Sequence, residues 1–144
     1  VEDQETADER IPTLLRMPAA VRFLSCEPLL GPITLNPWLL SEHGRRQIEA
    51  QRGLSWVIVG GESGPGARPF AIEWAHDIIG QCRSAAVSVF VKQLGSRPYS
   101  ETARTTPLSV EWDDTPQLRD KKGGDITEWP LGLRVREWPR ERDG

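Results

Sequence analysis

Three short runs of β-branched and apolar residues lie in the first two-thirds of the chain, and each is followed by polar or turn-forming residues. This pattern is typical of β-strands. The runs are almost continuously apolar, as in Trp56-Val57-Ile58-Val59, which is typical of strands covered on both faces in a parallel sheet. We therefore predict strands over Val21–Glu27, Ser55–Gly60 and Val87–Lys92, and a fourth if Val1 ends another strand.

Apolar residues at helical spacing precede the first predicted strand. Thr6 and Glu9 have the spacing of a capping box at the start of this helix. Pro12 is expected to kink or restart the helix, and Pro18 to end it. The apolar stripe itself consists of Ala7, Ile11, Leu14 and Leu15.

Two further helices are expected between the strands. Asn36-Pro37 has the character of an N-cap and first turn, and predicts a polar helix reaching about Ala50 with a solvated, charged face. The second helix, between the second and third strands, is amphipathic and serves as a crossover. Its apolar stripe consists of Trp74, Ala75, Ile78, Ile79 and Cys82.

Alternating strands and helices predict an α/β fold with a parallel sheet, because parallel neighbours need crossover connections. An open sheet and a barrel both satisfy this order. A complete eight-stranded barrel needs about 250 residues, so the 144 residues can supply part of one. We predict a partial (β/α) barrel with parallel strands over residues 1–95, the C-terminal portion of a TIM-like barrel. Residues 96–144 are predicted to form an irregular, loop-rich C-terminal tail packed on the barrel through Trp112, Trp129 and Trp138. Their low apolar content favours the alternative, a disordered tail.

Composition and charge exclude several classes of protein. The formal charge is −3, with basic and acidic residues interspersed, so nucleic acid is not indicated by charge. The longest apolar runs are far shorter than the roughly 20 residues that span a bilayer, and we expect a cytoplasmic protein without a membrane partner. Cys26 and Cys82 lack metal or disulfide spacing and are expected to be buried thiols. The chain begins at Val1 and its single methionine is Met17, from which we expect that either processing or truncation has removed the true start.

A glycine-rich turn after the second strand is the strongest candidate for a ligand site, because carboxyl ends of parallel strands carry the sites of barrels. Gly60 and Gly61 would let a ligand approach the backbone closely. Glu62 could bind an amino or hydroxyl group, and Arg68 could clamp a carboxylate or phosphate. A tight turn whose glycines serve only backbone geometry is equally compatible with these residues.

Charged residues also end the other two strands. Glu27 follows the first strand, and Lys92-Gln93 ends the third, at the same predicted edge as Glu62-Ser63. Together they favour a ligand site at this edge, with catalytic residues unassigned. An ordinary ion pair, Glu27–Lys92 or Glu62–Lys92, explains the same residues equally well.

Other catalytic chemistry is not indicated. Neither His43 nor His76 ends a predicted strand, and no cluster of His, Cys and Asp has metal-ligand spacing, so no metal site is predicted. Ser63 does not match the Gly-x-Ser-x-Gly elbow, because Pro65 follows it by two.

The order and length of several motifs resemble the phage-encoded family labelled gp thirty-seven/gp sixty-eight over nearly the whole chain. The stretch from Ser41 to Arg52 departs from it, being shorter in most relatives. The resemblance rests on Thr6-Ala7-Asp8-Glu9-Arg10-Ile11-Pro12, Val21-Arg22-Phe23-Leu24-Ser25-Cys26-Glu27-Pro28-Leu29-Leu30-Gly31-Pro32, Trp56-Val57-Ile58-Val59-Gly60-Gly61-Glu62-Ser63-Gly64, Phe90-Val91-Lys92-Gln93 and Lys122-Gly123-Gly124.

Members of that family are similar to radical S-adenosylmethionine enzymes, and their upstream half carries three closely spaced cysteines expected to hold an iron–sulfur cluster. The resemblance implies that full-length relatives reductively cleave S-adenosylmethionine on the cluster. It also implies that Glu27, Lys92 and the turn at Gly60-Gly61-Glu62-Ser63 help line the cavity. Because the three-cysteine segment is missing here, this chain alone is expected to hold neither the cluster nor S-adenosylmethionine, and to be inactive without the upstream half.

Two alternatives come from other classes of function. The chain could be a non-catalytic phage accessory or prophage remnant that self-associates, or binds a partner, through the strand edges of a partial barrel. It could also bind a small molecule or phosphate through the turn from Gly60 to Arg68 and a helix N-terminus. For none of these functions does the sequence predict a substrate.

Overall fold

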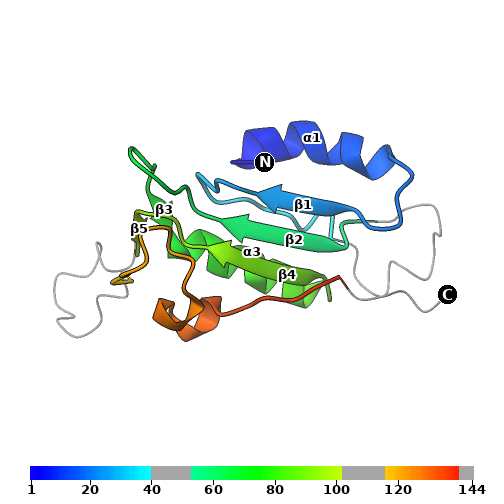
Figure 1. Cartoon of the computed structure of the whole chain (residues 1–144). Helices are drawn as coiled ribbons and strands as arrows, with labels where there is room; N and C mark the ends of the chain where they lie inside the picture. Colours follow the sequence, from blue (N-terminus) through cyan, green and yellow to red (C-terminus); the bar gives the residue numbers. More distant parts are fainter. Residues whose placement is uncertain (40–52, 102–115, 140–144) are drawn as a thin grey trace.

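The structure is a computed structural model, and it describes residues 1–39, 53–101 and 116–139. Its centre is a three-stranded sheet of order β1-β2-β4, in which every pair is parallel (Figure 1). The strands are β1 (Phe23–Cys26), β2 (Trp56–Gly60) and β4 (Ser88–Gln93). All three predicted strands are present, with ends that differ by at most two residues.

One face of this sheet is covered by the crossover helix α3 (Ile72–Ser84), as its apolar stripe predicted. Val57, Val59, Val89 and Val91 alternate along β2 and β4 and are 0% exposed, and they share one hydrophobic core with Ile78 of α3. Period-two alternation places the intervening residues on the opposite face. The described residues bury that face only in part.

The first helix, α1 (Gln4–Arg16), lies on the β1 side of the sheet (Figure 1). Its N-cap is Asp3, whose carboxylate accepts from the Thr6 backbone N–H at 2.9 Å, so the predicted box of Thr6 and Glu9 is wrong. Thr6 instead sits at the third helical position. The helix also continues through Pro12, because Pro12 and Asp8 lie on the exposed face, where water can satisfy the Asp8 carbonyl.

The described part of the predicted tail packs along the outer edge of β4. The Val91 N–H donates to the Val135 carbonyl at 2.8 Å, and the Glu137 N–H donates to the Val89 carbonyl at 2.9 Å. Trp129 is 1% exposed, between the short 3-10 helices η1 (Ile126–Glu128) and η2 (Leu131–Leu133). The tail thus occupies the sheet edge where another strand would otherwise pair. Trp112 lies outside the described residues.

A second, two-stranded parallel sheet joins β3 (Phe70–Ala71) to β5 (Pro98–Tyr99), and no pattern of residues predicted it. Where the polar helix was predicted, residues 36–39 form a turn, and the remainder of that segment lies outside the described residues. Val1 does not end a strand. Its N-terminal ammonium donates to the Ser25 carbonyl at 2.8 Å. The described chain is a mixed α/β fold with parallel sheets, and its strands form no closed barrel.

Candidate functional site

The candidate site lies on the open face of the sheet, which we define as the face opposite α3. Its residues come from alternate positions of the three strands and from the residue after β1. They are Phe23, Ser25, Glu27, Trp56, Ile58, Gly60, Phe90 and Lys92. The open face divides into a polar part at the carboxyl ends of the strands and an aromatic part at their amino ends.

The polar part is built around the carboxylate of Glu27. Its Oε1 lies 3.1 Å from Lys92 Nζ, and its Oε2 accepts from the Ser25 hydroxyl at 2.9 Å. The ion pair joins β1 to β4 across the intervening strand β2. Both side chains remain accessible, that of Glu27 at 21% and that of Lys92 at 57%.

Gly60 makes this crossing possible. A Cβ on Gly60 would lie 2.7 Å from Glu27 Oε1, closer than such atoms approach, so the carboxylate occupies the space a side chain would fill. The pairing of β2 with β4 also shifts register here, with Gly60 opposite Gln93. Gln93 holds the shifted strands together, because its side-chain amide donates to the Gly61 carbonyl at 2.9 Å. Lys92, two residues after Phe90 on the same face of β4, lies within reach of Glu27.

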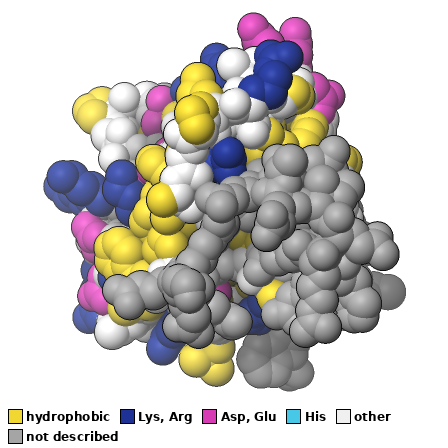
Figure 2. Space-filling model, turned by 90° about the vertical axis from the view of Figure 1, so that its right-hand side faces the viewer, with side chains coloured by type: hydrophobic (Ala, Val, Ile, Leu, Met, Phe, Trp, Pro, Cys, Tyr) yellow, Lys and Arg dark blue, Asp and Glu magenta, His cyan; other side chains and the backbone are white. Residues whose placement is uncertain are grey.

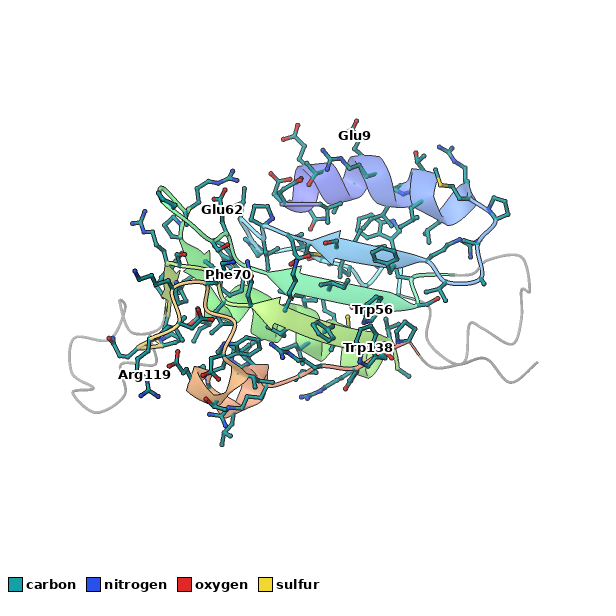
Figure 3. The ribbon with its side chains drawn as sticks, in the orientation of Figure 1. Glu9, Trp56, Glu62, Phe70, Arg119 and Trp138 are labelled. Atoms are coloured by element: carbon teal, nitrogen blue, oxygen red, sulfur yellow. The ribbon has the colours of Figure 1, made fainter. Side chains whose placement is uncertain are left out.

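A second ion pair lies in the glycine-rich turn. Arg68 donates to Glu62 through Nε at 2.7 Å, through its second guanidinium nitrogen at 3.1 Å and through its backbone N–H at 2.9 Å. These hydrogen bonds lower the pKa of the Glu62 carboxyl to about 2, the side-chain bonds contributing most. Both side chains are partly exposed (Figure 3, Glu62 labelled). Arg68 therefore binds Glu62 and does not present its planar fork to a ligand.

The predicted site residues thus form two groups. The first is Glu27, Gly60, Lys92 and Gln93, with Gly61 accepting from Gln93, and the second is the Glu62–Arg68 pair. Ser63 lies on the exposed side of the turn. The ion-pair alternative is realised as Glu27–Lys92, whereas Glu62 pairs with Arg68 and not with Lys92.

Two hydroxyl groups that form hydrogen bonds in the site were not predicted from the sequence. Ser25 is one of them. Because it lies two residues before Glu27, period-two alternation could have placed both side chains on the same face of the strand. Ser96 is the other: its Oγ accepts from the Gly64 N–H at 3.0 Å and donates to the Lys121 carbonyl at 2.6 Å. No local pattern marks Ser96, because its partners lie 32 and 25 residues away.

The aromatic part of the open face is a row of four rings, which we call the aromatic row: Phe23, Trp56, Phe90 and Trp138. Ring centroids lie 5.7 Å apart for Phe23 and Trp56, 6.2 Å for Trp56 and Phe90, and 5.4 Å for Trp56 and Trp138. Phe23 is 49% and Trp138 68% exposed. Figure 2 views the molecule from the end where the strands begin and shows hydrophobic side chains gathered there.

The two cysteines are free thiols in the core, as predicted. Burial raises the pKa of Cys26 to about 12 and that of Cys82 to about 12, so both are protonated at neutral pH. Three thiolates would be needed for the iron–sulfur cluster of the resembling family, and the residues of this chain do not fit that cluster.

Neither described α-helix is long and apolar enough to cross a bilayer.

Comparison with known proteins places this arrangement in a family. The chain belongs to the DUF5131 family. The family, described as "Protein of unknown function (DUF5131)", matches residues 1–124, which include all three strands and both ion pairs of the site. No curated protein and no solved structure matches the chain. The DUF5131 match therefore names a family without naming an activity, and function has to be argued from the site.

Proposed function

We propose that this chain is the C-terminal portion of a phage-type (β/α) barrel protein similar to radical S-adenosylmethionine enzymes. The observation that carries the proposal is the meeting of polar side chains from both sides of β2, at the carboxyl end of a sheet face that the described residues leave partly exposed. Glu27 from β1, Gly60 from β2 and Lys92 from β4 meet there. Barrels of parallel strands place their ligand sites at this end.

The half-buried open face supports a barrel in preference to a free-standing open sheet. In a barrel, one face of each strand contacts the surrounding helices and the other faces the interior. α3 covers the first face here, and the alternate residues Trp56, Ile58 and Phe90 form the second, which is partly exposed. Further strands of a longer polypeptide would enclose that face from the β1 side, because the tail occupies the outer edge of β4.

Within that barrel, Glu27 and Lys92 are proposed to face S-adenosylmethionine and the substrate. Glu27 is an acceptor and Lys92 a donor, and both keep solvent access at the carboxyl ends of their strands. The cluster would have to come from the upstream half with its three cysteines. This chain alone is proposed to be catalytically inactive.

The first test is the intact mass of the protein purified from its native source. A mass near twice 16.2 kDa is expected for a complete barrel protein. A native mass equal to that of this chain would refute the proposal.

The second test measures S-adenosylmethionine binding by the full-length protein in calorimetry. Glu27→Gln is expected to weaken binding by about 10-fold or more, because one charge-assisted hydrogen bond is lost. Glu9→Gln is the matched control, since Glu9 lies on the exposed face of α1 (Figure 3). Equal binding by both variants would remove Glu27 from the site.

A second candidate function is self-association without catalysis. It is favoured by the exposed rings of Phe23 and Trp138, and by the edge of β1, which has no strand partner among the described residues. Sedimentation of the native protein separates the two candidates: a dimer of 16.2 kDa chains would support the accessory role and refute the barrel.

A further inference from the structure

Three segments that are distant in sequence meet beside the carboxyl ends of the strands. They are the glycine-rich turn at residues 60–68, the connection at residues 94–97, and a loop of the tail at residues 120–124, which we call the tail loop. The Leu94 N–H donates to the Gly123 carbonyl at 2.9 Å, and the Ser96 N–H donates to the Glu62 carbonyl at 2.8 Å. The connection therefore bonds to the tail loop on one side and to the turn on the other.

The Ser96 hydroxyl lies at the centre of this junction. It accepts a hydrogen bond from the Gly64 N–H and donates its single proton to the Lys121 carbonyl, which uses the hydroxyl in both of its roles. One side-chain atom thus links the tail loop to the turn. The same turn carries the Glu62–Arg68 pair.

The tail loop is itself firmly held. The Asp120 carboxylate accepts from the backbone N–H groups of Lys122 and Gly124, and these bonds lower its pKa. The indole N–H of Trp129, which is 1% exposed, donates to the Gly123 carbonyl at 3.0 Å. The loop therefore has a fixed shape and a buried anchor.

Close backbone contact leaves no room for the tail loop to slide. Gly123 has a positive φ of 65°, and a Cβ there would lie 2.5 Å from the Gly95 carbonyl oxygen. Gly95 also has a positive φ, of 78°, and a Cβ on it would collide with the backbone of Glu62. Both positions require glycine, because three segments of the backbone are in contact here. Movement of the tail loop must therefore displace the connection or break its bonds.

We propose that the tail loop is a strap on the glycine-rich turn, acting through the Ser96 hydroxyl, so that the position of the tail sets the conformation of the turn. With the strap in place, Gly64 and the Glu62–Arg68 pair are held as the structure has them. When the tail loop is displaced, the hydroxyl loses its partner at Lys121 and the turn loosens. This device is independent of the cofactor of the proposed function.

The test is amide hydrogen exchange measured residue by residue by NMR on the full chain. Ser96→Ala removes the acceptor of the Gly64 N–H and is expected to speed its exchange about 5- to 10-fold, in line with the loss of one hydrogen bond. Ser84→Ala is the matched control, because it removes a single exposed hydroxyl bond, to Gly80, on α3. Ser96→Thr keeps the hydroxyl and is expected to keep exchange slow, which separates loss of the bond from misfolding.

Trp129→Phe tests the transmission from the tail. It keeps an aromatic ring but removes the N–H that binds Gly123. Exchange at Gly64 is expected to rise in this variant when Ser96 is present, and to show no further rise in a Ser96→Ala background. The proposal is overturned if Trp129→Phe speeds exchange at Leu94 alone, or if Ser96→Ala changes Gly64 by less than 2-fold.

Discussion

The two faces of the central sheet come from the same three strands and differ in what covers them. On the covered face, Val57, Val59, Val89 and Val91 are 0% exposed beneath α3. On the open face, Phe23 is 49% exposed. Alternate residues of an apolar run such as Trp56-Val57-Ile58-Val59 therefore differ in burial, because they lie on opposite faces of the sheet. The described chain therefore covers the apolar residues of the open face only in part, which is the basis for expecting a further layer.

The largest difference in stability is expected between substitutions of two tail tryptophans, one buried and one exposed. Trp129→Ala is expected to lower the free energy of unfolding by about 3 to 5 kcal/mol, because it empties a buried site. Trp138→Ala is the matched control and should cost about 1 kcal/mol, since Trp138 is 68% exposed and contributes ring contacts. Urea denaturation measures both. Similar losses would show that the open face is as firmly packed as the core.

Two isoleucines compare the faces of the sheet directly. Ile78→Ala, in α3 on the covered side, should cost about 2 to 5 kcal/mol. Ile58→Ala, in β2 on the open face, should cost less in this chain, because Ile58 is only half-buried.

The same isoleucine pair sharpens the comparison in a longer protein. If further strands enclose the open face, Ile58→Ala should become as costly as Ile78→Ala in the full-length protein. A penalty at Ile58 that stays small there would contradict the barrel.

Much of the covered face could be predicted from the sequence. The strands and α3 are local patterns: apolar runs of strand length, and a stripe at a spacing of three to four residues. The burial of Cys26 and Cys82 was expected because their spacing suits neither a metal site nor a disulfide. The predicted start of α1 was one turn too late, since its N-cap is Asp3 and not Thr6. Asp3 with Thr6 forms a cap as good as Thr6 with Glu9, and the choice between the two depends on tertiary packing.

The site was predicted less completely, because its contacts join distant segments. Glu27 and Lys92 were placed at one edge from strand order alone, yet their pairing depends on Gly60 and on the shifted register at Gln93. β3 and β5 are two residues long each, too short for periodicity to show. Ser96 links three segments through one hydroxyl, and such a junction has no local signature.

A smaller effect is expected where a side chain is added to the open face. In Gly60→Ala the new Cβ would press on Glu27 Oε1, and the flexible carboxylate can move aside, so the cost should be about 1 to 2 kcal/mol. The Glu27–Lys92 pair should separate, which the carbon-13 shift of the Glu27 carboxyl reports. Gly31→Ala is the control, because a Cβ there meets nothing within 4 Å. Removing the Glu27 side chain as well should relieve the penalty, and a penalty that persists would place the strain elsewhere.

The smallest effect concerns the exposed Glu62–Arg68 pair and is best followed by titration. Because the pKa of Glu62 is lowered to about 2 in the folded chain, below its ordinary value of 4.5, the pair is fully formed above that value and is lost as the pH falls through about 2. Arg68→Gln should move the carbon-13 titration midpoint of Glu62 upward, while Arg10→Gln, which breaks the exposed pair with Glu2, should leave it unchanged.

The titration also decides what Arg68 is free to do. A midpoint near 2 means that Arg68 remains bound to Glu62 throughout the neutral range, so an anion could recruit it only by displacing a carboxylate held by three hydrogen bonds. A midpoint near the ordinary value would mean that the pair is open in solution. Arg68 would then be available to a phosphate or carboxylate, and the glycine-rich turn would join the polar part of the open face as a binding surface.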